Sequence, residues 1–125
     1  MSVRFPPAKG DIEYWEGPVK ILFVCSENRL RSPTAAAVFS EYEGVEAISA
    51  GTNKDCDNPV CGDLIEWADI ILVMEKSHRI KVSRKFRPLL KNKRLCVLDI
   101  PDDYDYMDPL LVRKLRNRVP QYVRI

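Results

Sequence analysis

Residues 19–33 of the 125-residue chain read VKILFVCSENRLRSP, and this stretch decides the fold class. The run 19–24 is short, apolar and rich in strand-forming residues, which is typical of a strand buried on both faces of a sheet. A polar loop, 25–32, follows. Ser32 and Pro33 then predict the start of a helix, with Ser32 as N-cap and Pro33 at the first helical position. The stretch therefore predicts a strand, a loop and a helix in direct succession.

The same alternation continues along the rest of the chain. The pattern predicts further strands at 45–50, 69–74 and 94–99, and helices at 34–42, 59–68, 75–86 and 110–122. Strands that alternate with helices imply right-handed crossovers and a parallel sheet covered on both faces. We therefore predict a three-layer α/β/α domain with a central four-stranded parallel sheet. Ligands of such domains bind at the carboxyl ends of the strands, where the loop 25–32 would lie.

The composition bounds the number of domains and the kinds of partner. A hydrophobic fraction of 46% in 125 residues fits one globular domain. A net charge of +2 gives no reason to expect nucleic acid or an anionic membrane as a partner, and it leaves the oligomeric state open. The apolar runs fall short of the roughly 20 residues that a membrane span needs, and residues 1–20 lack the pattern of a secretory signal. We expect a cytoplasmic protein.

The beginning of the chain differs from the remainder. Proline and glycine punctuate residues 1–18 without any periodicity, which predicts a flexible arm ahead of a domain at 19–125. Tyr14 and Trp15 either dock this arm on the domain or are incidental aromatic residues.

The chain has four cysteines, at positions 25, 56, 61 and 96, and we expect them to be reduced. Cys56 and Cys61 are separated by four residues, and His78 is the only histidine that could join them as a metal ligand. A structural zinc site needs four ligands, so the sequence gives little support to a metal site.

Cys25 and Arg31 have a spacing that suits phosphate chemistry. Backbone N–H groups of a tight loop at a helix N-terminus form a cradle for an anion, and the helix dipole adds positive potential. The planar guanidinium of Arg31 can bind two phosphate oxygens. The same positive field favours the thiolate of Cys25, which would then be a nucleophile.

Two further residues of the loop support this interpretation. Asn28 tolerates the left-handed backbone conformation that a tight loop requires, and the hydroxyl of Ser32 could donate a hydrogen bond to the thiolate. The ordinary alternative is a buried cysteine that ends a strand, followed by a solvated basic loop. The spacing Cys-x5-Arg-Ser-Pro at a strand-to-helix junction favours the phosphate-binding interpretation, and no glycine-rich nucleotide-binding motif competes with it.

Residues 24–33, VCSENRLRSP, resemble the signature of the low-molecular-weight protein tyrosine phosphatases. The resemblance continues in SAGT at 49–52, ADIILVM at 68–74 and Asp-Pro at 108–109. It implies hydrolysis of aryl phosphate monoesters, phosphotyrosine above all, with Cys25 as nucleophile, Arg31 on the equatorial oxygens, and Asp108 as acid and then base. The implied partner is a phosphorylated protein or a small aryl phosphate, and no metal or other cofactor is required. The substrate-binding residues implied in this way are Ser26, Glu27, Asn28, Arg29, Leu30, Ser32 and Tyr106.

The choice of the acid depends on the resemblance. Five aspartates lie between positions 99 and 108, and all of them follow a predicted strand. Asp108 before Pro109 is by itself a common helix N-cap arrangement, and only the Asp-Pro match favours it as the acid. Trp67 is expected in the core, and His78 is expected on the solvated face of a basic helix.

Several residues depart from the family's pattern and keep two other functions open. Glu27 stands where the family often has glycine, Leu30 replaces a second loop cysteine, and leucines follow Asp-Pro where tyrosines are usual. A regulatory module that binds phosphate with little turnover is the first alternative. A thiol-dependent arsenate reductase is the second, and it would need two further redox cysteines.

Overall fold

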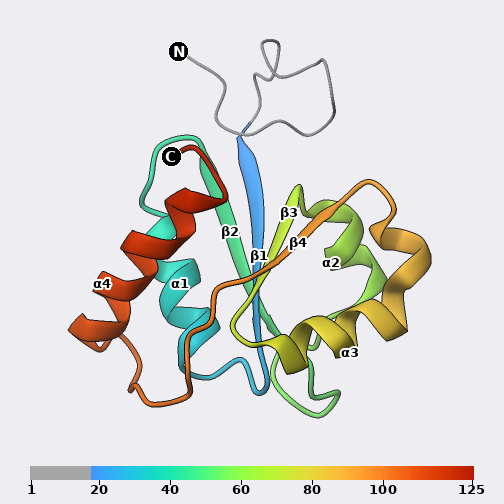
Figure 1. Ribbon diagram of the computed structural model, residues 1–125, viewed down its shortest axis with the longest axis horizontal. Coiled ribbons are helices and arrows are strands. Elements are labelled where there is room, and N and C mark those ends of the chain that lie inside the picture. The colour runs from blue at the N-terminus through green and yellow to red at the C-terminus, as the bar shows by residue number, and fades with distance from the viewer. Residues whose placement is uncertain (1–17) are drawn as a thin grey trace.

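The computed structural model describes residues 18–125, which form one parallel sheet with helices on both faces (Figure 1). The strands are β1 (Val19–Cys25), β2 (Val45–Gly51), β3 (Ile70–Val73) and β4 (Arg94–Val97), in the spatial order β2-β1-β3-β4. The helices are α1 (Arg31–Phe39), α2 (Gly62–Trp67), α3 (Lys76–Phe86) and α4 (Pro109–Arg118), with short 3-10 turns η2 (Arg87–Leu90) and η3 (Val119–Gln121). The predicted three-layer fold with four parallel strands is confirmed.

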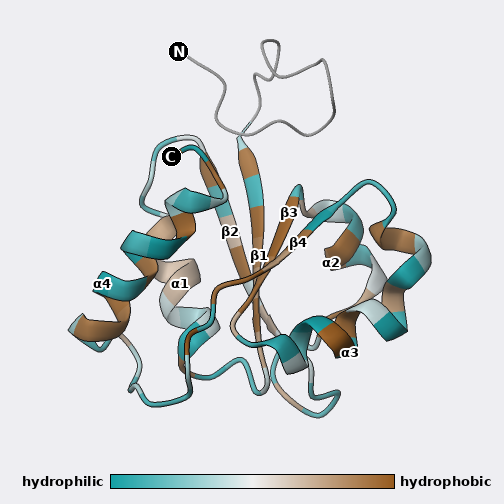
Figure 2. Cartoon of the chain, viewed as in Figure 1, coloured by the Kyte–Doolittle hydropathy of each residue, from teal (hydrophilic) through white to brown (hydrophobic). Residues whose placement is uncertain are grey.

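The two faces of the sheet carry separate cores. Phe23 of β1 packs on one face with Phe39 and Leu115, from the side covered by α1 and α4. Leu22 and its neighbours pack on the other face, which α2 and α3 cover. Strand β1 pairs with β2 and β3 and is therefore central, which is why its sequence is apolar on both faces. Figure 2 shows the same division, with hydrophobic strands inside and hydrophilic outer helix faces.

The start of α1 corrects the sequence prediction. Leu30, and not Ser32, is the N-cap, and no side chain caps the helix. Ser32 lies in the first turn, where its hydroxyl is 3.0 Å from the sulfur of Cys25 and donates to Asn28 Oδ1. The hydroxyl is engaged with the preceding loop and does not cap the helix. The first N–H groups of α1 are therefore left without a side-chain acceptor.

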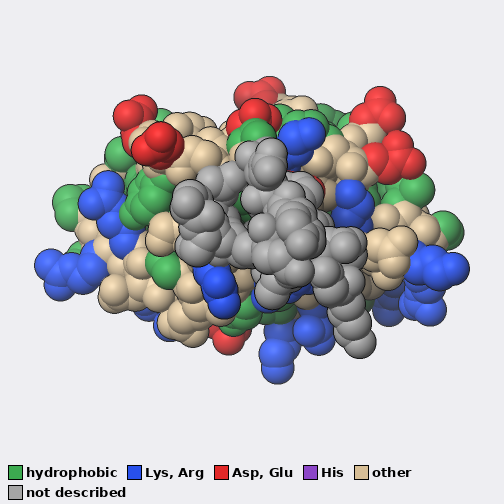
Figure 3. Space-filling view, turned by 90° about the horizontal axis from the view of Figure 1, so that it is seen from above, with side chains coloured by type: hydrophobic (Ala, Val, Ile, Leu, Met, Phe, Trp, Pro, Cys, Tyr) green, Lys and Arg blue, Asp and Glu red, His purple; other side chains and the backbone are tan. Residues whose placement is uncertain are grey.

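Charge is unevenly distributed over the described chain. Residues 18–75 contain ten acidic and four basic residues, whereas residues 76–125 contain five acidic and 14 basic ones. On the face seen in Figure 3, most acidic side chains lie along the upper edge, and most basic ones lie at the sides and along the lower edge. The low net charge conceals this separation.

None of the helices within residues 18–125 is long and apolar enough to cross a membrane. The predicted arm lies outside the described residues, apart from Pro18.

Candidate active site

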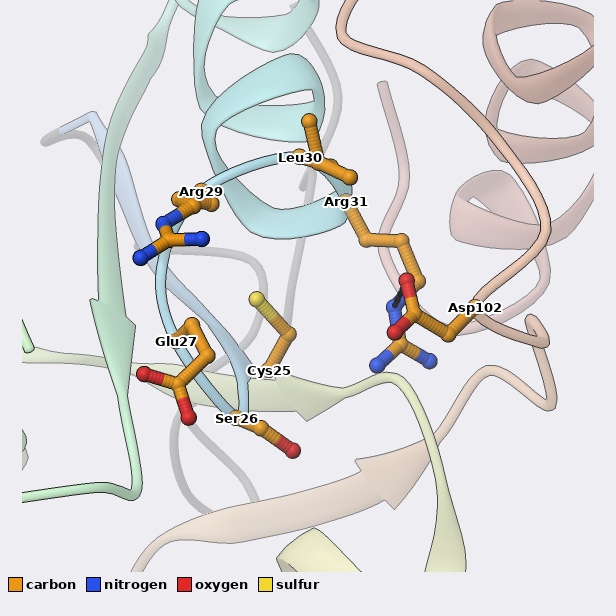
Figure 4. A pocket seen from close by; sticks show the side chains of 7 residues that line it. All are labelled: Cys25, Ser26, Glu27, Arg29, Leu30, Arg31 and Asp102. Carbon is orange, nitrogen blue, oxygen red and sulfur yellow. Dashed lines mark ion pairs between the residues drawn. The ribbon is translucent and has the colours of Figure 1, made fainter.

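The carboxyl end of β1 leads directly into the loop that the sequence singled out (Figure 4). Cys25 is the last residue of β1 and is 3% exposed. Asn28 has a φ of 55°, which confirms the predicted left-handed conformation. Its side-chain amide donates to the carbonyl of Asp57 at 2.9 Å, and this bond ties the loop to the segment after β2. The loop therefore turns back across the end of the sheet and meets α1.

Gly51 makes this turn possible. It pairs with Cys25 in the sheet, and a Cβ atom at position 51 would lie 2.7 Å from the carbonyl oxygen of Ser26 and 3.1 Å from the nitrogen of Asn28. Both of these are backbone atoms, so the loop would have to move to admit a side chain. The glycine in the SAGT stretch at 49–52 is explained by this close approach.

Cys25 and Ser32 form the contact that the sequence predicted. The sulfur and the hydroxyl oxygen are 3.0 Å apart and buried. The Ser32 hydroxyl has one proton, which it can donate either to Asn28 Oδ1 or to an ionised Cys25, because a thiolate has no proton to give. The geometry thus suits stabilisation of a thiolate.

Arg31 is buried and held in place by groups from distant parts of the chain. Its Nη1 donates to the carbonyl of Ile100 at 2.7 Å and to the carboxylate of Glu75. A second carboxylate, that of Asp102, lies 3.7 Å from Nε. Arg31 is only 3% exposed, so these partners compensate the burial of its charge and fix the guanidinium beside the loop.

A cavity of about 110 Å³ opens above Cys25. Its volume corresponds to about four water molecules, each occupying about 30 Å³, which is enough for a phosphoryl group. Glu27 and Arg29 stand on one side of Cys25, whereas Arg31 and Asp102 stand on the other (Figure 4). The cavity is lined by Cys25, Ser26, Glu27, Arg29, Leu30, Arg31 and Asp102.

Only some of the predicted substrate-binding residues line the cavity. Ser26, Glu27, Arg29 and Leu30 line the cavity beside Cys25 and Arg31. Asn28 and Ser32 are not among the lining residues, but they hold the loop through their mutual hydrogen bond. Tyr106 is 53% exposed and does not line the cavity.

Asp108 caps α4, as its position before Pro109 allows. Its Oδ1 accepts a hydrogen bond from the backbone N–H of Leu110 at 2.9 Å, and the residue is not among those that line the cavity. Met107, just before it, has a φ of 61° and donates its backbone N–H to Thr34 Oγ1 at 2.9 Å. A left-handed methionine is uncommon, and strained backbone of this kind clusters at functional sites.

His78 and Glu75 were missed by sequence reasoning. His78 was expected on a solvated helix face, but it is 1% exposed, and burial, with a smaller contribution from Arg31, lowers its pKa to about 4. Its Nε2 lies 2.9 Å from Ser26 Oγ in the loop. The available signal was the spacing of Glu75 and His78 across the first turn after a buried strand, which suits reciprocal capping of a helix.

No protein-family model matches the chain, and no curated protein matches it. Solved structures do match. The tyrosine phosphatase Wzb from Escherichia coli K30, in complex with phosphate, is 20% identical with a TM-score of 0.66, and the match covers 82% of this chain and 94% of that one. The low-molecular-weight tyrosine phosphatase SP-PTP from Streptococcus pyogenes is 14% identical with a TM-score of 0.68, covering 82% and 92%.

The arginine phosphatase YwlE from Geobacillus stearothermophilus is 22% identical with a TM-score of 0.63, and the match covers 80% of this chain and 85% of that one. At such identities the likeness concerns the fold. The resemblance that residues 24–33 indicated is confirmed at this level: the chain has the fold of the low-molecular-weight tyrosine phosphatases.

Proposed function

We propose that the protein is a phosphatase that works through a cysteinyl-phosphate intermediate. The observation that carries the proposal is the position of Cys25, beside the uncapped N-terminus of α1 and the buried guanidinium of Arg31 in a cavity of phosphoryl size. Each of these groups stabilises negative charge, which develops on the equatorial oxygens as phosphorus is attacked. The positive charge for this role comes from the chain itself.

The reaction would proceed in two displacements. The thiolate of Cys25 attacks phosphorus, the bond to the leaving oxygen breaks, and a carboxylic acid gives that oxygen a proton. Water then attacks the cysteinyl phosphate, the same carboxylate accepts its proton, and the S–P bond breaks to release inorganic phosphate. The thiolate of Cys25 is restored.

Asp108 is the acid that we propose. Asp102 is closer to the cavity, but its carboxylate faces Arg31 at 3.7 Å, a role that requires the charged form, whereas a general acid must arrive protonated. Asp108 is favoured by the Asp-Pro match at 108–109, and the backbone next to it is anchored to α1 through Thr34. We therefore assign Asp102 to the positioning of Arg31 and Asp108 to proton transfer.

The proposed substrate is an aryl phosphate monoester, with phosphotyrosine in a protein as the natural form. Phosphoarginine is a second candidate. The cavity wall includes the carboxylate of Glu27, whose Oε2 also accepts from Asn53 Nδ2 at 2.9 Å, and none of the residues from 18–125 that line the cavity is aromatic. A carboxylate can accept hydrogen bonds from the N–H groups of a guanidine leaving group, which an aryl leaving group lacks.

Trapping the intermediate tests the mechanism. A molar excess of an aryl phosphate is mixed with the enzyme without added metal, the reaction is quenched within milliseconds, and the peptide that contains Cys25 is analysed for a phosphoryl group. We expect a phosphorylated cysteine and a stoichiometric burst of the aryl alcohol. Turnover that persists in Cys25→Ser would refute the mechanism.

Further measurements separate the alternatives. Wild-type protein that binds phosphate or vanadate without turnover would indicate a regulatory module. Thiol-dependent reduction of arsenate that is lost on changing Cys56, Cys61 or Cys96 would indicate a reductase. A panel with phosphotyrosine and phosphoarginine peptides decides the substrate class, and Glu27→Gln should lower the rate on phosphoarginine alone.

A further inference from the structure

The N-terminus of α3 contacts both ends of the phosphate loop. At the start of the loop, Ser26 Oγ is 2.9 Å from Nε2 of His78. At its end, Nη1 of Arg31 donates to the carboxylate of Glu75. Glu75 is the N-cap of α3 and His78 is the third residue of its first turn, so one short segment holds two points that are five residues apart in the loop.

The hydrogen bonds of His78 determine where its proton lies. Nδ1 accepts the backbone N–H of Glu75 at 3.0 Å, so the proton of the neutral ring is on Nε2 and is donated to Ser26 Oγ. The ring is buried and its pKa is lowered to about 4, so the neutral form prevails at neutral pH. The charged groups that act on it are Arg31, Glu75, Lys81 and Asp102.

Glu75 and His78 are coupled to each other. The side chain of Glu75 accepts from the backbone N–H of His78, while the side chain of His78 accepts from the backbone N–H of Glu75. This reciprocal capping box fixes both side chains relative to the helix start. A displacement of either residue would therefore be transmitted to the other and to the loop.

The hydroxyl of Ser26 acts as an anchor. Figure 4 shows its oxygen pointing away from the sulfur of Cys25, although the residue lines the cavity. His78 therefore reaches the back of the loop, and substrate would sit on the other side. Its effect on chemistry must pass through the position of the loop.

We propose that Glu75 and His78 form a positioning clamp, which holds Ser26 and Arg31 so that the loop amides and the guanidinium converge on one phosphoryl group. The proposal rests on the proposed phosphatase function. Groups fixed before the reaction stabilise developing charge without reorganising, and displacements of about 1 Å are costly. His78 is thus a positioning residue, and the clamp is the part of the site that α3 supplies.

Two substitutions of His78 separate the clamp from simple capping. His78→Asn places an amide oxygen near the position of Nδ1 and can keep the bond to Glu75, but it is too short to reach Ser26. His78→Gln places an amide nitrogen near the position of Nε2 and can keep the bond to Ser26. Ser26→Ala removes the same bond from the loop side. Ser77→Ala, an exposed serine on the same helix, is the matched control.

The readouts are binding of inorganic phosphate, measured as protection of Cys25 from alkylation, and kcat/KM for an aryl phosphate. We expect His78→Asn and Ser26→Ala each to weaken phosphate binding and to lower kcat/KM by about threefold to tenfold, because each removes one hydrogen bond. His78→Gln should recover most of this loss and Ser77→Ala should show none. The double variant Ser26→Ala with His78→Asn should lose no more than either single one, because both remove the same bond.

Other outcomes overturn the clamp. Phosphate binding and kcat/KM at the wild-type level in His78→Asn, or additive losses in the double variant, would show that the bond to Ser26 does not position the loop, while the phosphatase function would stand. Failure of the wild-type protein to bind phosphate or to turn over substrate would refute the proposed function and the clamp with it.

Discussion

The two loops that meet at the cavity are built in opposite ways. The loop 25–32 is short, and its members are tied to one another and to α3, as the bonds of Ser32 to Asn28 and of Ser26 to His78 show. The segment 99–108 is longer and more open: the side chain of Asp102 is 66% exposed, and Tyr106 and Met107 are exposed as well. Its anchors include the carbonyl of Ile100, which accepts from Arg31, and the N–H of Met107, which donates to Thr34.

The difference matches the two tasks that the proposed phosphatase mechanism requires. The nucleophile and the phosphate-binding groups must be in place before substrate arrives, since their contribution depends on preorganisation. The acid must reach a leaving group whose size varies with the substrate, so a looser segment suits it. We therefore expect substitutions in the first loop to have large effects and those in the second to have graded ones.

Cys25→Ser should have the largest effect. Replacing the nucleophile removes the covalent route, and we expect kcat for an aryl phosphate to fall by at least about 10⁴-fold. Circular dichroism and phosphate binding serve as controls that the fold and the cavity persist. Substantial residual turnover would mean that the rigid loop binds phosphate without supplying the nucleophile.

Asp108→Asn and Asp102→Asn compare two acids within the open segment. Asp108→Asn removes the proposed proton donor, so it should lower kcat by about 10²–10³-fold and flatten the alkaline limb of the pH profile of kcat. Asp102→Asn should instead raise KM several-fold and leave that limb in place, because it removes only a partner of Arg31. A reversal of the two results would identify Asp102 as the acid.

Gly51→Ala tests how tightly the first loop is packed. The added Cβ would meet the backbone of Ser26 at 2.7 Å, and we expect a loss near the upper end of about 1–3 kcal/mol in the free energy of unfolding, measured in urea. Gly62→Ala is the matched control, since its Cβ would approach only the side-chain tip of Leu89, at 3.2 Å. Equal stability of both variants would show that the loop can yield.

A change of pH tests the contact between the loop and α3. The folded state lowers the pKa of His78 to about 4 from 6.5. Between these pH values the unfolded chain therefore binds more protons than the folded chain. The free energy of unfolding decreases as pH falls from about 6.5 to about 4. From pH 7 to pH 5 we expect wild-type protein to lose up to about 2 kcal/mol more than His78→Asn.

His78 is the only histidine, so this difference in urea unfolding can be assigned to it. Asp69 has a raised pKa because of burial, and its contribution changes in the opposite direction, but it is common to both proteins and cancels. If the free energy of unfolding depends on pH in the same way in both proteins, the pKa of His78 is not lowered by folding.

Prediction from sequence succeeded where the signal is local. The apolar run that begins at Val19, the strand-to-helix junction and the left-handed Asn28 all follow from the preferences of neighbouring residues. It failed for the N-cap of α1, which is Leu30 and not Ser32, although the predicted contact between Ser32 and Cys25 is present; the role that Ser32 takes depends on the loop's path. It also failed for His78, because a helix rich in Lys and Arg does not disclose which residue faces the loop.

The amino-acid sequence alone predicts the order of strands and helices and the spacing of Cys25 and Arg31, on which the proposed phosphatase chemistry rests, because backbone preferences and residue types act over a few positions. Only the tertiary structure decided which of the five aspartates faces Arg31, and that Glu75 and His78 hold the loop from α3. Those contacts join residues 44 to 71 positions apart, whose proximity follows from the packing of the strands and helices between them.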